Sequence, residues 1–104
     1  MPMAGRMRES ITLLEPIYND RHEESGTVEH PVRAEIRAAR GNEILEAMQV
    51  NAYLTHRCWI RWRPEIKADW RVRWGDRELA IDVPIPDRKR RWIELRLVER
   101  EPVT

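Results

Sequence analysis

The chain has 104 residues, which is enough for one domain with one hydrophobic core and too few for two. Its 19 lysines and arginines nearly balance 18 aspartates and glutamates, so the net charge of +1 gives no general attraction to nucleic acid or to membranes. Any electrostatic function must therefore come from local patches. We expect a single domain over residues 1–104, with mobile ends at 1–8 and 100–104.

Cysteine and histidine are scarce. The single cysteine, Cys58, rules out a disulfide within the chain, and His22, His30 and His56 form no metal-ligand spacing. No apolar run approaches the roughly 20 residues of a membrane-spanning helix, and the N-terminus lacks the apolar core of a secretory signal. The sequence predicts a soluble protein made in a reducing, intracellular compartment, with no metal, cofactor or membrane partner.

The N-terminal third predicts two strands joined by a long loop. Apolar and polar residues alternate in a first strand over residues 9–18, where Pro16 indicates a sheet edge or an end. Residues 19–30 (NDRHEESGTVEH) are polar, so they are expected to form a loop and are the best candidate for disorder. Strict alternation over residues 32–38 then predicts a second, half-buried strand.

A short helix is expected next. Gly41 ends the second strand, and Asn42 can cap a run of good helix formers over residues 43–49. An isolated helix of this length is marginal in water, so packing must hold it or it stays flexible. The apolar side chains that share one face of it are Ile44, Leu45 and Met48.

The most informative stretch is residues 51–75, which holds four of the five tryptophans. Residues 54–63 and residues 70–74 each alternate large apolar side chains with arginine, the pattern of half-buried strands. The polar segment 64–69 begins with a proline and separates them. The two runs are therefore predicted to pair with each other as a long-looped hairpin.

The C-terminal third predicts two more strands. A Gly-Asp turn after Trp74 leads back into alternation over residues 78–83, which the prolines beyond it should end. A basic loop, Arg88–Arg91, then precedes a last alternating run over residues 93–98.

About six short strands and one short helix predict a mainly all-β fold. A small antiparallel β-barrel with one long flexible loop is the economical arrangement, since closure hides both the apolar face and the strand edges. One core is expected, formed by Leu54, Ile60, Trp62, Val72, Trp74, Ile81, Ile93 and Leu95.

The sequence shows no catalytic motif, and the chain is expected not to be an enzyme. His56 and Cys58 could be imagined as a base and its thiol. Their i, i+2 spacing on a strand, however, places both on the apolar face, which favours packing.

Tryptophans flanked by arginines are also typical of surfaces that stack the bases of single-stranded nucleic acid. Three of the four tryptophans in residues 51–75 share the phase of the apolar strand residues, which favours the core instead. Trp59 falls on the other side, with Arg57 and Arg61, where an exposed indole favours a partner interface. Arg88–Arg91 could bind phosphates or simply be solvated, and the acidic pair Glu23–Glu24 is equally ambiguous.

Taken in order, these features resemble the phage head-tail joining proteins, also called head-closure or head completion proteins. The similarity covers nearly the whole chain, and its most specific part is Thr55-His56-Arg57 with Ile60-Arg61-Trp62-Arg63 and an aromatic residue before Gly75. The segments that carry it are Arg8 before the first strand, VRAEIRAARG with GNEILEAMQ (residues 32–49), THRCWIRWRPEI (55–66), WRVRWGDRELAIDVPIPD (70–87) and RRWIELRLVE (90–99).

The resemblance implies a small barrel that assembles as a ring, dodecameric, beneath the portal or its adaptor after DNA packaging. Such a ring closes the filled head, lets packaged DNA pass through its channel and offers the tail a docking surface. The protein would then be a virion component that is made and assembled in the cytoplasm of a bacterial host. The near-neutral charge fits, because a strongly basic channel would bind phosphates and hinder ejection.

Two hypotheses follow: a structural connector protein of a tailed phage or prophage, and an OB- or SH3-like barrel module that binds single-stranded nucleic acid. In the first, the isolated subunit should be a monomer or weak oligomer, because surface ion pairs contribute only about 0 to 1 kcal/mol each. Contacts between subunits and with the portal adaptor are predicted for Glu23, Glu24, Arg57, Trp59, Arg61, Arg88, Lys89, Arg90 and Arg91.

Overall fold

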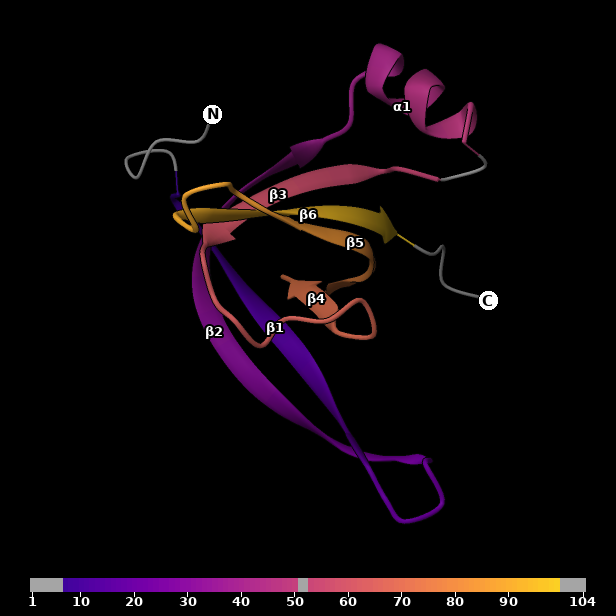
Figure 1. Cartoon of the computed structure of the whole chain (residues 1–104), viewed down its shortest axis with the longest axis vertical. Helices are drawn as coiled ribbons and strands as arrows, with labels where there is room; N and C mark the ends of the chain where they lie inside the picture. Colours follow the sequence, from indigo (N-terminus) through magenta and orange to yellow (C-terminus); the bar gives the residue numbers. More distant parts are fainter. Residues whose placement is uncertain (1–6, 51–52, 100–104) are drawn as a thin grey trace.

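The computed structural model describes residues 7–50 and 53–99. In that part of the chain, six strands form a closed barrel and one helix stands outside it (Figure 1). The predicted mobility of residues 1–6 and 100–104 concerns positions outside the described residues, and Met7 is buried. The elements are β1 (Glu9–Tyr18), β2 (Glu24–Ala38), α1 (Gly41–Met48), β3 (His56–Arg61), β4 (Arg71–Trp74), β5 (Arg77–Pro86) and β6 (Trp92–Glu99).

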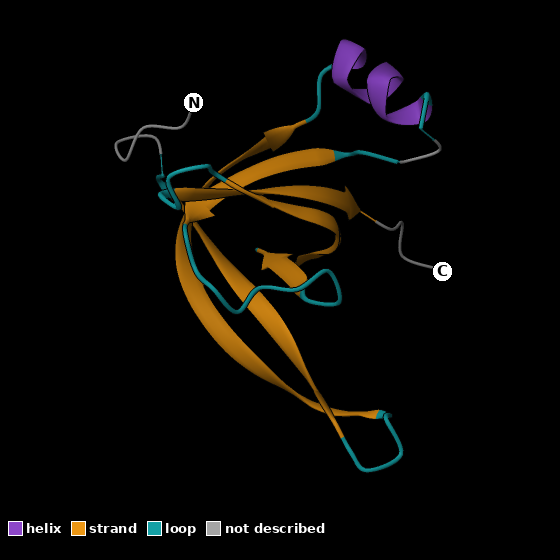
Figure 2. Ribbon diagram, viewed as in Figure 1, coloured by secondary structure: helices purple, strands orange, loops and turns teal. Residues whose placement is uncertain are grey.

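The order of strands around the barrel is β1-β2-β3-β6-β5-β4, and every neighbouring pair is antiparallel. The pairing of β1 with β4, which places Leu13 opposite Val72, closes the barrel. Figure 2 shows the strands wrapped around one interior with the helix apart from them at one end. The predicted mainly β fold, a six-stranded antiparallel barrel with one short helix, is confirmed.

The interior of the barrel is filled by the apolar face of every strand, as period-2 alternation requires. Trp70, just before β4, is buried and only 2% exposed, while Trp62 and Trp74 are partly buried and pack against the core from its rim. Trp62 and Trp74 were predicted to be buried core residues, but they are only partly buried, because each lies where a strand ends. The other predicted core residues, Leu54, Ile60, Val72, Ile81, Ile93 and Leu95, are all buried.

The predicted hairpin between residues 54–63 and 70–74 is wrong. β3 lies between β2 and β6, whereas β4 lies between β1 and β5. Alternation fixes which side chains face the core but not which strand is the neighbour. The segment between them instead crosses from one side of the barrel to the other, as Figure 1 shows.

The predicted loop at residues 19–30 is mostly strand. β2 begins at Glu24, and the β1–β2 pairing continues out to Tyr18 opposite Glu24. The turn is ordered by Asn19, whose Oδ1 accepts hydrogen bonds from the backbone N–H groups of Arg21 (2.9 Å) and Glu23 (3.0 Å). The polar composition was misleading because arginines of β4 pair with Glu24 and Glu29 of this segment.

The distal part of this hairpin, residues 15–29, is called the arm. β4 pairs with β1 only at Thr12–Leu14, and β3 pairs with β2 only from Ala34 onward, so the arm has two strands and no third. It extends away from the barrel in Figure 1, on the side opposite α1.

Helix α1 begins at Gly41 and has Arg40, not the predicted Asn42, as its N-cap. The Glu43 carboxylate accepts a hydrogen bond from the Arg40 backbone N–H at 2.8 Å, which closes the first turn. Ala47 is its buried residue, while Leu45 (63%) and Met48 (57%) are exposed. The helix is held to the barrel by charges on Glu43 rather than by an apolar face.

β5 continues through two prolines that were predicted to end it. It pairs with β4 only up to Ala80, and beyond a bulge at Ile81/Val83 it pairs with β6 alone as far as Pro86. A strand with one neighbour has an open side, where a missing N–H is tolerated. The predicted tight β4–β5 turn is confirmed, with Gly75 at φ 64°.

Candidate functional site

His56 and Cys58 lie on the core side of β3, as the packing interpretation predicts. Burial raises the pKa of the Cys58 thiol to about 12, so the thiolate that nucleophilic chemistry needs does not form near neutral pH. The His56 ring nitrogens lie 3.0 Å from Thr55 Oγ1 and 3.2 Å from Arg77 Nη2. Burial, followed by the charge of Arg77, lowers the pKa of His56 and keeps the ring neutral.

Within residues 7–50 and 53–99, no group of three or more histidine, cysteine, aspartate or glutamate side chains is placed to hold a metal ion. No helix in this same part of the chain is long and apolar enough to cross a bilayer.

The outer face of the barrel carries an ionic network across β2, β3 and β6. Arg37, Arg57 and Arg96 lie directly opposite one another on these strands, which would be repulsive without counter-charges. Glu43 of α1 pairs with Arg37 and Arg57, and Glu94 of β6 pairs with Arg57 and Arg96. Hydrogen bonds from Arg37, then from the Arg40 backbone N–H, hold the pKa of Glu43 far below its usual range.

Trp59 lies in the middle of this face, opposite Glu35 of β2 and Glu94 of β6. The guanidinium carbons of Arg57 and Arg37 are 4.7 Å and 5.4 Å from its ring centroid. The indole is therefore half-buried between cations rather than freely exposed, which corrects the prediction of an open indole.

A groove of about 490 Å³ runs beside Trp59. β2 and β3 contribute Glu35, Arg37 and Arg57. Ile85 of β5, Trp92 at the start of β6 and Asp87 just after β5 complete this part of the lining. Ile85 is 38% exposed, and Trp92 is half-buried. The groove thus combines two indoles and an aliphatic side chain with paired charges of both signs, the composition of a protein-binding surface.

The basic loop 88–91 borders the groove at Asp87. Asp87 shapes the loop: its backbone carbonyl accepts from the Arg90 N–H (2.9 Å), and its carboxylate accepts from Arg91 Nε and from the Lys89 N–H, each at 3.2 Å. Arg90, at φ 55°, lies over the Trp62 ring at 5.6 Å. Arg88 and Lys89 make no ion pair with any described residue, so their charge faces outward.

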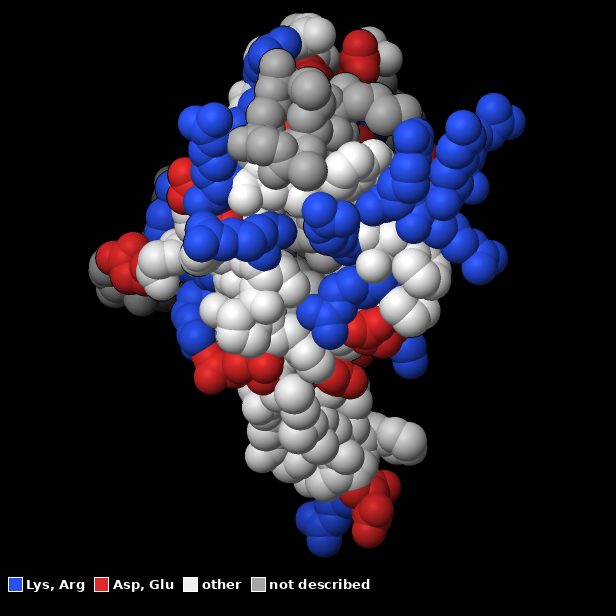
Figure 3. Space-filling model, turned by 90° about the vertical axis from the view of Figure 1, so that its left-hand side faces the viewer, with Lys and Arg blue, Asp and Glu red and all other residues white. Residues whose placement is uncertain are grey.

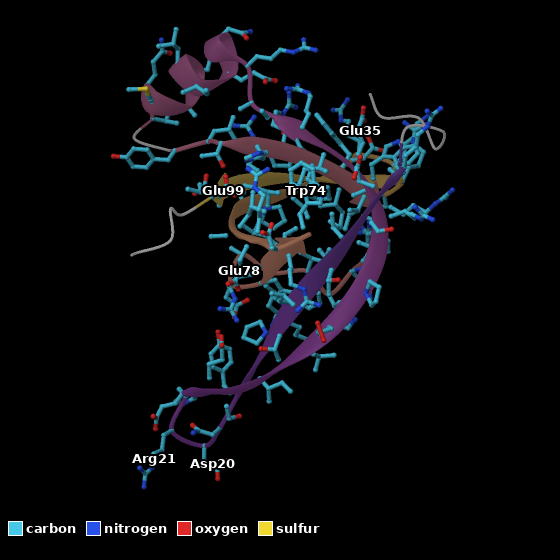
Figure 4. The ribbon with its side chains drawn as sticks, turned by 180° about the vertical axis from the view of Figure 1, so that it is seen from behind. Asp20, Arg21, Glu35, Trp74, Glu78 and Glu99 are labelled. Carbon is cyan, nitrogen blue, oxygen red and sulfur yellow. The ribbon has the colours of Figure 1, made fainter. Side chains whose placement is uncertain are left out.

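The predicted interface residues fall into two groups. Arg57, Trp59 and the basic loop meet at the groove, and Arg61, exposed at the end of β3, lies opposite Trp92 of β6. Glu23 and Glu24 lie instead at the tip of the arm, beside Asp20 and Arg21, which Figure 4 shows at the far end of the molecule from Glu35. On the face that Figure 3 shows, Lys and Arg side chains gather over the barrel, and charged side chains mark the tip of the molecule's lower extension.

Four of the five tryptophans do not form an open platform for stacking bases. Trp70 is buried and stacks on His30, with centroids 5.1 Å apart and the planes 9° from parallel. Trp59 and Trp62 have guanidinium groups over their rings, and Arg77 lies in the same way 5.0 Å from Trp74. Base stacking needs a free aromatic face, and these four faces are occupied within the chain.

A family model for phage head completion proteins matches residues 2–100. The chain belongs to the phage head completion protein family. The resemblance found in the sequence is thereby confirmed.

The chain is similar over nearly its whole length to the solution structure of protein SF1141 from Shigella flexneri 2a. It is 27% identical, with a TM-score of 0.73, and the match covers 94% of this chain and 96% of that one. Among curated proteins, no match is found.

Several side chains of this family member's outer face were missed by sequence reasoning. Glu43, Glu94 and Trp92 belong to the ionic network and the groove. Glu43 and Glu94 were assigned only to a helix and a strand pattern, and Trp92 lay outside the predicted strand 93–98. Their roles depend on β3 lying between β2 and β6, and the predicted β3–β4 hairpin hid that arrangement. The sequence offered one usable signal: Glu43 stands three residues after the true N-cap.

Proposed function

We propose that this head completion protein is a structural connector subunit that forms a ring under the portal or its adaptor, closes the DNA-filled head and provides the surface on which the tail docks. The observation that carries the proposal is the family match over residues 2–100. In this proposal the whole chain is one domain, the ring is dodecameric, and packaged DNA passes through its channel. The subunit is made in the host cytoplasm and stays in the virion.

The described residues support a binding role rather than catalysis. The barrel interior is filled by side chains, the one thiol is buried, and Arg37, Arg57, Asp87 and Glu94 of the groove are engaged in ion pairs. What remains exposed is a charged loop, an aromatic groove and an arm, which are features suited to contacts with other proteins. We infer a non-enzymatic function.

Binding of single-stranded nucleic acid has less support. The basic loop 88–91 would favour it, but a stacking platform requires open aromatic faces, and guanidinium groups cover three of the indoles. Tight, steeply salt-dependent binding of a fluorescent oligonucleotide with quenched tryptophan emission would favour this alternative.

The direct experiment is deletion of the gene from its phage or prophage. We expect heads that package DNA but lose it or lack tails, and expression of the full chain in trans should restore infectious particles. Normal yields of tailed, DNA-filled particles from the deletion would overturn the proposal.

A further inference from the structure

The arm exposes the continuation of the core face. Residues directly opposite in β1 and β2 share a face, so Ile11, Leu13 and Ile17 lie on the same side as Val28 and Val32. Inside the barrel this face is covered: Ile11 is 2% exposed and Leu13 is fully buried. In the arm the same face meets solvent, and Ile17 (45%) and Val28 (38%) are exposed.

A two-stranded ribbon with exposed aliphatic side chains is an incomplete structure. Such a hairpin is marginally stable in water until a third strand or another surface covers its apolar face. Beyond Leu14, β1 has no partner except β2, and β2 has none except β1 before Ala34. Among the described residues, neither edge of the arm pairs with a third strand, although Tyr18 donates a hydrogen bond to Asp69 and Glu24 pairs with Arg71. The face that carries Ile17 and Val28 is exposed.

The chain's own groove cannot supply that cover. Glu24 at the arm tip and Glu35 at the groove belong to one continuous strand and are held roughly 35 Å apart at about 3.3 Å per residue. Figure 4 shows Asp20 at the tip of the arm and Glu35 far from it, beyond the other end of the arm. An arm that docks in such a groove therefore docks in the groove of another copy.

The two surfaces are complementary in charge and in chemistry. Asp20 and Glu23 at the tip make no ion pair with any described residue, and the tip also carries Arg21. Arg88 and Lys89, in the loop that joins the groove residues Asp87 and Trp92, likewise make no ion pair with any described residue. Aliphatic side chains on the arm match the indoles and Ile85 of the groove. Both surfaces are present on every copy and lie at opposite ends of it, which is the arrangement of a head-to-tail contact that closes into a ring.

We propose that the arm of one copy docks in the groove of the next copy, with Ile17 and Val28 against Trp59, Trp92 and Ile85, and with Asp20 and Glu23 beside Arg88 and Lys89. This deepens the proposed function, because it names the contact that joins neighbouring subunits. The occupant of the groove is a second copy of this chain, and not the adaptor or a tail protein.

Cross-linking between variants that each carry one added cysteine tests the contact. The full chain carrying Glu23→Cys is mixed with the full chain carrying Lys89→Cys at the highest soluble concentration and treated with a short bis-maleimide. Cys58 is buried and does not compete. We expect a mixed dimer, and a ladder of higher species when one chain carries both substitutions. The matched control replaces Lys89→Cys with Asp76→Cys, at the exposed β4–β5 turn away from the groove.

Charge reversal supplies the second part of the test, with the added cysteines at Ile17→Cys in one chain and Ile85→Cys in the other. Reversing only the tip (Asp20→Lys with Glu23→Lys), or only the loop (Arg88→Glu with Lys89→Glu), should reduce the yield of this cross-link severalfold. Mixing a chain with the reversed tip and a chain with the reversed loop should restore the yield. Equal yields with the Asp76→Cys control, or no rescue in the mixed reversal, would overturn the contact. Cross-linking of Glu23→Cys to a larger virion protein in particles, with none between copies, would also overturn it.

The outcomes separate this contact from the proposed function. If the gene deletion leaves particles normal while the ladder forms, the contact stands and the phage role fails. If the deletion yields tailless heads while no ladder forms, the connector role stands and the arm docks elsewhere.

Discussion

Arg37 on β2 and Glu43 on α1 form a two-pronged ion pair, with both guanidinium nitrogens 2.9 Å from the two carboxylate oxygens. The same carboxylate also pairs with Arg57 and closes the first turn of the helix. One side chain therefore holds the helix in place and neutralises two arginines that lie opposite each other in the barrel wall.

Replacing Glu43 should release the helix and leave the barrel folded. We expect Glu43→Ala to destabilise by roughly 1 to 3 kcal/mol, because it leaves Arg37 without its ion pair, leaves Arg57 with Glu94 alone and removes the helix cap. Hydrogen exchange should accelerate at residues 41–48 far more than in β6. Glu46→Ala, on an exposed face of the same helix, is the control and should change neither quantity.

Acid should weaken the fold in two stages. The pKa of His56 is lowered in the folded state, so unfolded chains bind protons first below the ordinary value of 6.5, and stability is lost as the pH falls toward the folded pKa. The pKa of Glu43 is also lowered, so its contribution is present above its unfolded pKa and is lost in stronger acid. Urea melts at a series of pH values measure the free energy of unfolding. Just below pH 6.5 this free energy should change less with pH in His56→Gln than in wild type, and in stronger acid the two should change alike. The same pH dependence in both proteins at every pH would contradict this.

Core and rim tryptophans should differ in their contribution to stability. Trp70→Ala should cost about 3 to 5 kcal/mol because the indole is fully enclosed. Trp62→Ala and Trp74→Ala should cost less, since both are partly buried and would leave a gap open to solvent. Chemical denaturation of the three variants measures the order, and equal losses would refute the assigned positions.

Assembly, not folding, should depend on the groove and its basic loop. Arg88→Glu with Lys89→Glu, and separately Trp59→Ser, should leave the melting temperature near normal while giving DNA-filled heads that leak or lack tails in complementation. Arg90 and Arg91 are reversed in a separate variant because they contact Trp62 and Asp87. Infectious particles at the normal yield from all three variants would show that these residues are not the interface.

The Cys58 thiol should be unreactive until the protein unfolds. With its pKa raised to about 12 and its side chain fully buried, Cys58 should not react with iodoacetamide at pH 8. Labelling should appear across the same urea range as the loss of tryptophan signal. Rapid labelling of the native protein would contradict the burial of β3.

Local alternation predicted which side chains of β3 and β6 face the core, because period 2 is a property of each strand alone. It did not predict that β3 lies between β2 and β6, since neighbours are chosen by barrel closure, which the sequence pattern does not record. The sequence did not predict the arm, because charged residues such as Glu24 and Glu29 are typical of a loop. In the structure these glutamates pair with Arg71 and Arg73 of β4 and lie in a strand. Among the site residues, Arg57 and Trp59 were found by their phase, whereas Glu43 acts from an element outside the sheet.

Neighbouring strands of the barrel pair over very different lengths. β1 and β2 are matched at ten positions, but β1 and β4 are matched at only three, from Thr12 to Leu14. The local opening of the barrel that costs the least free energy is therefore the separation of the short β4–β5 hairpin from β1, with the rest of the sheet intact. The barrel is thus a curved sheet closed by the short β1–β4 pairing, and we expect it to open locally at that pairing without global unfolding.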